Sequence, residues 1–90
     1  MTPQQYLEYL KGRYKTLAYF KFSLQNADKE KFEDLKNQLL EEIFENEKMY
    51  FDFSKQGLIL APIQKEYENL TNYSQKVMEF FVMFKTLNKF

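Results

Sequence analysis

The sequence predicts a mainly α-helical fold with a minor β component: two N-terminal helices, a β-hairpin near residues 49–61 and a long C-terminal helix. Three observations predict it. Apolar residues recur at helical spacing over most of the chain. A capping pattern opens the first helix. Apolar and polar residues alternate, as in strands, in a short central stretch. The alternative is an all-α three-helix bundle.

The 90 residues fit one domain, 1–90. Ten Phe and seven Tyr residues supply apolar surface for a core. The 13 basic and 13 acidic residues cancel, so no overall field attracts nucleic acid or a membrane. The chain has no cysteine, and its polar N-terminal segment lacks the apolar region of a signal peptide. We therefore expect a cytoplasmic protein.

The first helix is expected to begin after Thr2, which can act as its N-cap. Pro3 suits the first helical position, and Gln5 completes a capping box. Residues 19–24 fit either the end of this helix or a short strand, and helix through about Leu24 is favoured.

Gly12 lies in the middle of the predicted first helix, where glycine is unfavourable. We expect Gly12 to permit close packing of another element. The second helix is predicted from about Lys29 to Asn46, with Asn26 or Asp28 as N-cap. Its apolar stripe consists of Phe32, Leu35, Leu39, Leu40, Ile43 and Phe44.

Charge is distributed unevenly, because the first helix has an excess of basic residues and the second an excess of acids. The simplest expectation is that the two helices lie against each other, with charge pairs selecting that arrangement.

The central stretch has two interpretations. Phe51 and Phe53 alternate with Asp52, and residues 54–57 suit a turn that ends in glycine, which together favour a hairpin. In the competing interpretation a helix ends at Gly57 in a C-cap, and an extended linker follows. The third helix then runs from Pro62 to about Asn88.

Residues 77–84 of the third helix are apolar on nearly every side. A helix of this kind is buried on more than one face, and we expect a small core to leave part of this apolar surface uncovered. We therefore expect one face to pack inward and another to meet a second chain, most simply another copy. The predicted interface consists of Val77, Met78, Phe81, Val82, Phe84 and Phe90.

No residue pattern predicts catalysis. The chain has no histidine and no cysteine, so the commonest general base and the thiol nucleophile are missing. Its two glycines cannot form a glycine-rich phosphate loop. We expect no enzyme activity, cofactor or metal site. The sequence predicts a non-enzymatic protein–protein interaction module, such as an adaptor, an assembly factor or a small inhibitor, that binds itself as a homodimer and another protein. Its acidic partner surface consists of Asp34, Glu41, Glu42 and Glu45.

The alternative function is nucleic-acid binding through Lys11, Arg13 and Lys15, which are interleaved with tyrosines. One short basic patch on a neutral domain is a weak electrostatic footprint. Contact between this patch and the acidic second helix is the simpler expectation.

Overall fold

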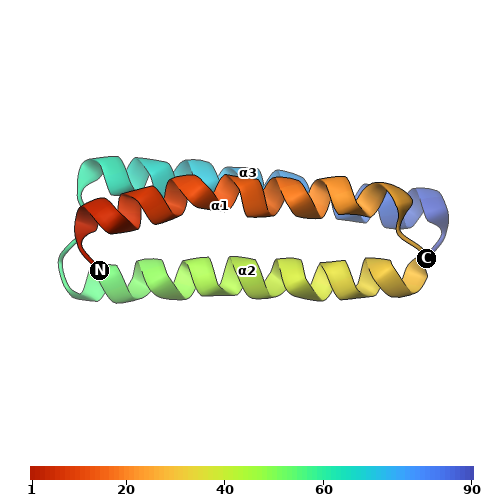
Figure 1. The fold of residues 1–90 in the computed structure, drawn as a ribbon, viewed down its shortest axis with the longest axis horizontal. Helices are drawn as coiled ribbons and strands as arrows, with labels where there is room; N and C mark the ends of the chain where they lie inside the picture. Colours follow the sequence, from red (N-terminus) through yellow and green to blue (C-terminus); the bar gives the residue numbers. More distant parts are fainter.

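Three long helices form a rod in the computed structural model, which describes residues 1–90. They are α1 (Pro3–Ser23), α2 (Lys29–Lys55) and α3 (Ala61–Asn88), with a short 3-10 turn, η1 (Leu24–Asn26), after α1. The rod measures 45 × 17 × 16 Å. Helices α1 and α3 run side by side, and α2 runs back along them (Figure 1). The fold is therefore the all-α three-helix alternative.

The helix starts follow the predicted capping chemistry. The Gln5 N–H donates to the Thr2 hydroxyl at 3.2 Å, and the Thr2 N–H donates to the Gln5 side chain at 2.8 Å. The Lys31 N–H donates to the Asp28 carboxylate at 2.8 Å, which caps α2. Helix α1 continues to Ser23, so residues 19–24 form no strand.

The hairpin predicted near residues 49–61 is wrong, and so is the predicted end of the second helix at Asn46, because α2 continues to Lys55. Gly57 follows with a φ of +70°. The Leu58 N–H donates to the Phe53 carbonyl at 3.1 Å and the Gly57 N–H donates to the Ser54 carbonyl at 3.0 Å. These two bonds form a Schellman C-cap, the competing interpretation of this stretch.

Packing explains why the helix continues through the central stretch. As part of α2, Phe53 is buried and its ring stacks on Tyr6 of α1 at 4.3 Å between centroids. Phe51, on the other side of the helix, is exposed. The alternation of these aromatic residues with Asp52 therefore does not reflect a two-sided strand.

The end of α3 uses the same type of cap without glycine. Lys89 has a φ of +56°, and the Phe90 N–H donates to the Lys85 carbonyl at 3.1 Å. The cap turns the Phe90 ring back onto the bundle, where its centroid lies 5.6 Å from Phe32 and 5.8 Å from Phe84.

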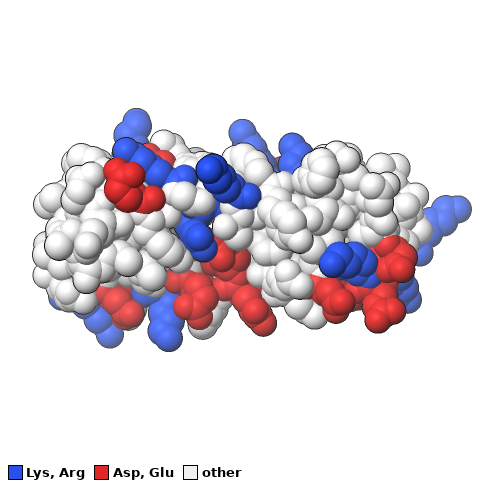
Figure 2. Space-filling model, in the orientation of Figure 1, with Lys and Arg blue, Asp and Glu red and all other residues white.

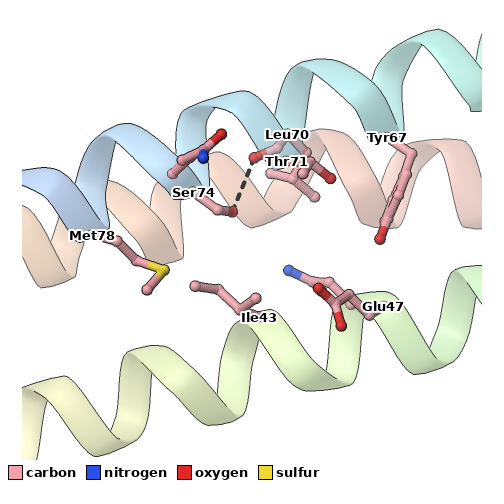
Figure 3. A pocket seen from close by; sticks show the side chains of 9 residues that line it. Ile43, Glu47, Tyr67, Leu70, Thr71, Ser74 and Met78 are labelled. Atoms are coloured by element: carbon pink, nitrogen blue, oxygen red, sulfur yellow. Dashed lines mark hydrogen bonds between the residues drawn. The ribbon is translucent and has the colours of Figure 1, made fainter.

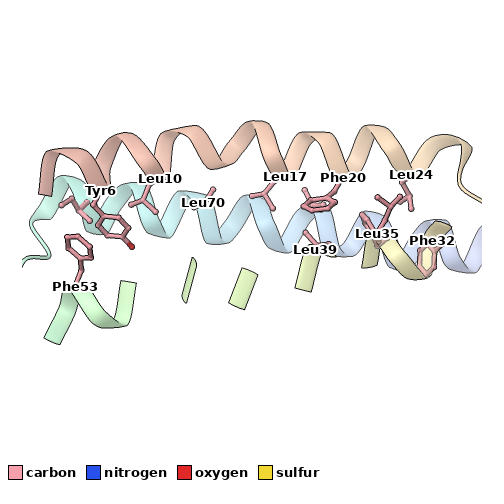
Figure 4. Packing of buried hydrophobic residues seen from close by; sticks show 13 residues of the cluster. Tyr6, Leu10, Leu17, Phe20, Leu24, Phe32, Leu35, Leu39, Phe53 and Leu70 are labelled. Atoms are coloured by element: carbon pink, nitrogen blue, oxygen red, sulfur yellow. The ribbon is translucent and has the colours of Figure 1, made fainter. Parts of the chain in front are cut away.

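The core is one continuous seam between the three helices. Its positions, including those occupied by polar or half-buried side chains, recur at spacings of three and four residues, as in coiled coils. Tyr6 and Phe53 pack at one end of the seam, and Phe32 packs at the other (Figure 4). The buried apolar residues are Tyr6, Leu10, Leu17, Phe20, Leu24, Phe32, Leu35, Leu39, Phe53, Ile63, Leu70, Val77 and Phe81.

The expectation that Gly12 permits close packing is wrong. Gly12 is exposed, and a Cβ atom added there would meet nothing within 4 Å. It therefore weakens α1 without serving a contact.

The two glycines should respond oppositely to alanine. Gly12→Ala should raise the free energy of unfolding by about 1 kcal/mol, because alanine is the better helix former. Gly57→Ala should lower it by about 1 kcal/mol, because a side chain is strained at positive φ. Chemical denaturation followed by circular dichroism measures both changes. A destabilising Gly12→Ala variant would contradict the open surroundings of Gly12.

Candidate functional site

Polar side chains interrupt the middle of the apolar seam. Arg13 of α1 and Glu42 of α2 each occupy a seam position of their helix, and an Arg13 nitrogen lies 3.2 Å from a Glu42 carboxylate oxygen. The Arg13 guanidinium also lies 4.8 Å from the centre of the Tyr9 ring. Basic α1 and acidic α2 are therefore joined here as expected. On the face drawn in Figure 2, basic side chains gather mostly over α1 and acidic ones mostly along α2.

Asn46 follows Glu42 by one helical turn and is the least satisfied polar residue of the seam. It is only 4% exposed, yet neither its side-chain oxygen nor its nitrogen has a hydrogen-bond partner in the protein. Ser74, which faces it from α3, is satisfied, because its hydroxyl donates to the Leu70 carbonyl at 2.9 Å. Buried amides in folded proteins nearly always have partners, so Asn46 is an exception within the seam.

Asn46 and Ser74 line a pocket of about 230 Å³ between α2 and α3. Tyr67, Thr71 and Ser74 project into it from α3, opposite Ile43 and Glu47 of α2 (Figure 3). Glu47 is its one charged lining residue.

A second pocket of about 230 Å³ lies further along the same two helices. It is lined mainly by apolar side chains, together with Lys36 and Lys85. Met78 lines both pockets, so they are neighbours along the same pair of helices. We call the two pockets together the α2–α3 groove; it is lined at one end by Glu47 and at the other by two lysines.

Exposed apolar side chains border the α2–α3 groove. Leu40 and Phe44 of α2 line a shallow depression beside it, together with Glu41 and Glu45. Met78 and Val82 border it from α3. All four apolar residues are exposed. The predicted apolar stripe of the second helix included Leu40 and Phe44; the structure places both outside the core, each one position after a residue that packs inward.

The predicted C-terminal interface is divided by the structure. Val77 and Phe81 are only 2% and 3% exposed and belong to the core, so a partner cannot reach them in the folded bundle. Phe84 and Phe90 are partly buried against Phe32. Met78 and Val82 are the members that face the groove and remain exposed.

The four residues of the predicted acidic surface also have different environments. Glu42 is partly buried and is paired with Arg13. Asp34, Glu41 and Glu45 are exposed and recur at helical spacing along α2. No group of three or more acidic side chains is arranged to hold a metal ion.

The predicted basic patch is partly neutralised within the chain. Lys11 lies 4.0 Å from Glu8, Arg13 is paired with Glu42, and Lys15 makes no ion pair. None of the helices has the length and apolar character required to cross a membrane. No protein family, curated protein or solved structure matches the chain.

Tyr6 should make the protein sensitive to alkaline pH. Burial, and to a lesser extent the neighbouring tyrosines, raises the pKa of Tyr6 above its ordinary value of about 10. The unfolded chain therefore releases this proton at lower pH than the folded protein does, and the free energy of unfolding should fall as pH rises above about 10. Because the Tyr6 hydroxyl has no partner, Tyr6→Phe should change stability at neutral pH by less than about 1 kcal/mol and reduce the alkaline loss. Denaturation of both proteins between neutral and alkaline pH measures this, and identical pH profiles would contradict it.

Asn46→Leu should raise the free energy of unfolding by about 1–2 kcal/mol, because it replaces an unpartnered buried amide with an apolar group beside an existing pocket. Ser74→Ala is the matched control on the facing helix. It removes a hydroxyl that is already bonded to its own helix, so its effect should be smaller. Urea denaturation compares the variants. Destabilisation by Asn46→Leu would mean that the amide is satisfied, for example by water in the pocket.

Proposed function

We propose that this chain is a non-enzymatic protein-interaction module that binds another polypeptide through the α2–α3 groove. The observation that carries the proposal is the cluster of exposed apolar side chains along that groove: Leu40, Phe44, Met78 and Val82. Exposed apolar patches with polar borders are typical of interaction sites, and methionine and aromatic residues are enriched in interface cores.

The chemistry of the groove supports binding rather than catalysis. Its more polar pocket offers the amide of Asn46, hydroxyl-bearing residues from α3 and the carboxylate of Glu47. The chain supplies no histidine or cysteine as general base or nucleophile. An adaptor, an assembly factor or a small inhibitor would use such a surface, and the absence of cysteine favours a cytoplasmic location.

Acidic side chains would contribute to partner choice. Glu41 and Glu45 border the exposed Leu40 and Phe44, and Lys36 and Lys85 line one end of the groove, so a partner with charges of both signs around an apolar centre would fit this surface. Charges at the edge of an interface act on association rate and specificity more than on affinity. Nucleic-acid binding through Lys11, Arg13 and Lys15 has less support, because Arg13 already forms an ion pair with Glu42.

Binding in the groove predicts position-specific cross-linking. Val82 and Met83 are neighbours on α3 with similar exposure, 65% and 58%, but only Val82 lines the pockets at the groove. A photo-reactive phenylalanine analogue is placed at either position, and the variants are irradiated in the cells that encode the protein. Val82 should yield a discrete adduct, and Met83 should not.

Two outcomes would count against the proposed function: the absence of an adduct at Val82, or equal adducts at both positions. The control for folding is circular dichroism, because both positions are exposed and neither substitution should alter the helix content. The mass of the adduct also tells whether the bound polypeptide is another copy of the chain or a different protein.

A further inference from the structure

We propose that the α2–α3 groove binds a second copy of this chain in antiparallel orientation, with Lys36 of each copy facing Glu47 of the other. This inference rests on the proposed function, because it names the partner of the same groove.

The charges of the groove are self-complementary. The pocket at one end contains Lys36 and Lys85 as its charged lining residues, and the pocket at the other end contains Glu47. A copy placed in the same direction would bring lysines opposite lysines. A copy rotated by 180° brings the basic end of each groove opposite the acidic end of the other, so charge selects the antiparallel arrangement.

The position of these charges along α2 fits a two-fold axis. Lys36, Leu40 and Glu47 recur at spacings of four and seven residues and therefore lie along one side of the helix. An axis that crosses the groove near Leu40 and Met78, perpendicular to the helices, pairs α2 with α2 of the second copy. The axis lies about midway between Lys36 and Glu47, so it creates the Lys36–Glu47 contact twice, as an isologous interface requires.

This register also gives the interface an apolar centre and a polar edge. Leu40, Phe44, Met78 and Val82 lie between the two charged ends. This arrangement matches the anatomy of protein interfaces.

The existing contact of Lys36 does not prevent the proposed one. Lys36 lies 2.8 Å from Glu33, one turn earlier on α2. Exposed pairs of this kind contribute little to stability, so the lysine is free to exchange partners.

The test uses charge reversal at the two positions, with self-association measured by sedimentation equilibrium. Lys36→Glu and Glu47→Lys should each weaken self-association by about tenfold or more, because each variant brings two like-charged pairs together. An equimolar mixture of the two variants should restore association to about the wild-type level. In the mixed dimer, the glutamate introduced at position 36 of one copy faces the lysine introduced at position 47 of the other. The second contact joins the unchanged Lys36 and Glu47, so both pairs are again opposite in charge.

The control is Lys48→Glu, which makes the same charge change as Lys36→Glu at a position of α2 that lines neither pocket. It should leave self-association unchanged. Circular dichroism verifies that each variant keeps its helix content, so that a loss of association is not a loss of folding.

Three results would overturn the inference: a wild-type protein that stays monomeric, single variants that associate as well as the wild type, or a mixture that associates no better than its components. These failures differ from failure of the proposed function. The wild-type protein could be monomeric while Val82 still cross-links specifically to a different protein. That result would support the proposed function and rule out a second copy as the partner in the groove.

Discussion

Hydrophobic contact along a single narrow seam is the constraint on which this structure depends. Three helices in a rod 17 Å across bury one strip of each helix, and each strip has one side chain every three or four residues. The seam is closed by Phe53 on Tyr6 at one end and by Phe32 with Phe81 and Phe90 at the other. Apolar residues beyond these strips must stay on the surface, because the bundle has no second layer to cover them.

Local chemistry at the helix ends was predictable from the sequence, and tertiary contact was not. The caps at Thr2 and Asp28 depend on residues within one turn, so their sequence pattern is sufficient. The conformation of the stretch after Asn46 instead depends on the contact between Phe53 and Tyr6, which lies far from it in the sequence. Without that contact, the alternation of aromatic and polar residues favours a strand. Gly57 did indicate the helix end, because a C-cap glycine is a local signal that needs no distant contact.

The candidate site was predictable only as a region. The sequence locates the apolar surplus in residues 77–84, but the rotation of α3 decides which of them are exposed. That rotation is set by contacts with α1, where Tyr73 meets Tyr14 edge to face and Phe80 lies beneath Lys21. These contacts turn Val77 and Phe81 inward and leave Met78 and Val82 at the groove. The rotation of α2 likewise decides which of its apolar residues are buried, because Leu39 is in the core and the adjacent Leu40 is not.

The polar residues of the seam, Arg13, Glu42 and Asn46, connect the core to the groove. An apolar group in place of Asn46 would suit the seam better, since leaving polar groups unpaired in a core costs stability. However, a seam made only of apolar residues tolerates sliding by a heptad, whereas a buried polar contact fixes register. Sliding α2 against α1 would separate Arg13 from Glu42 and bury a charge against apolar side chains. We infer that the Arg13–Glu42 pair fixes the register and rotation of α2. That rotation places Leu40 and Phe44 on the exposed side of α2 beside the groove, so a polar pair in the seam also determines which apolar side chains reach the surface.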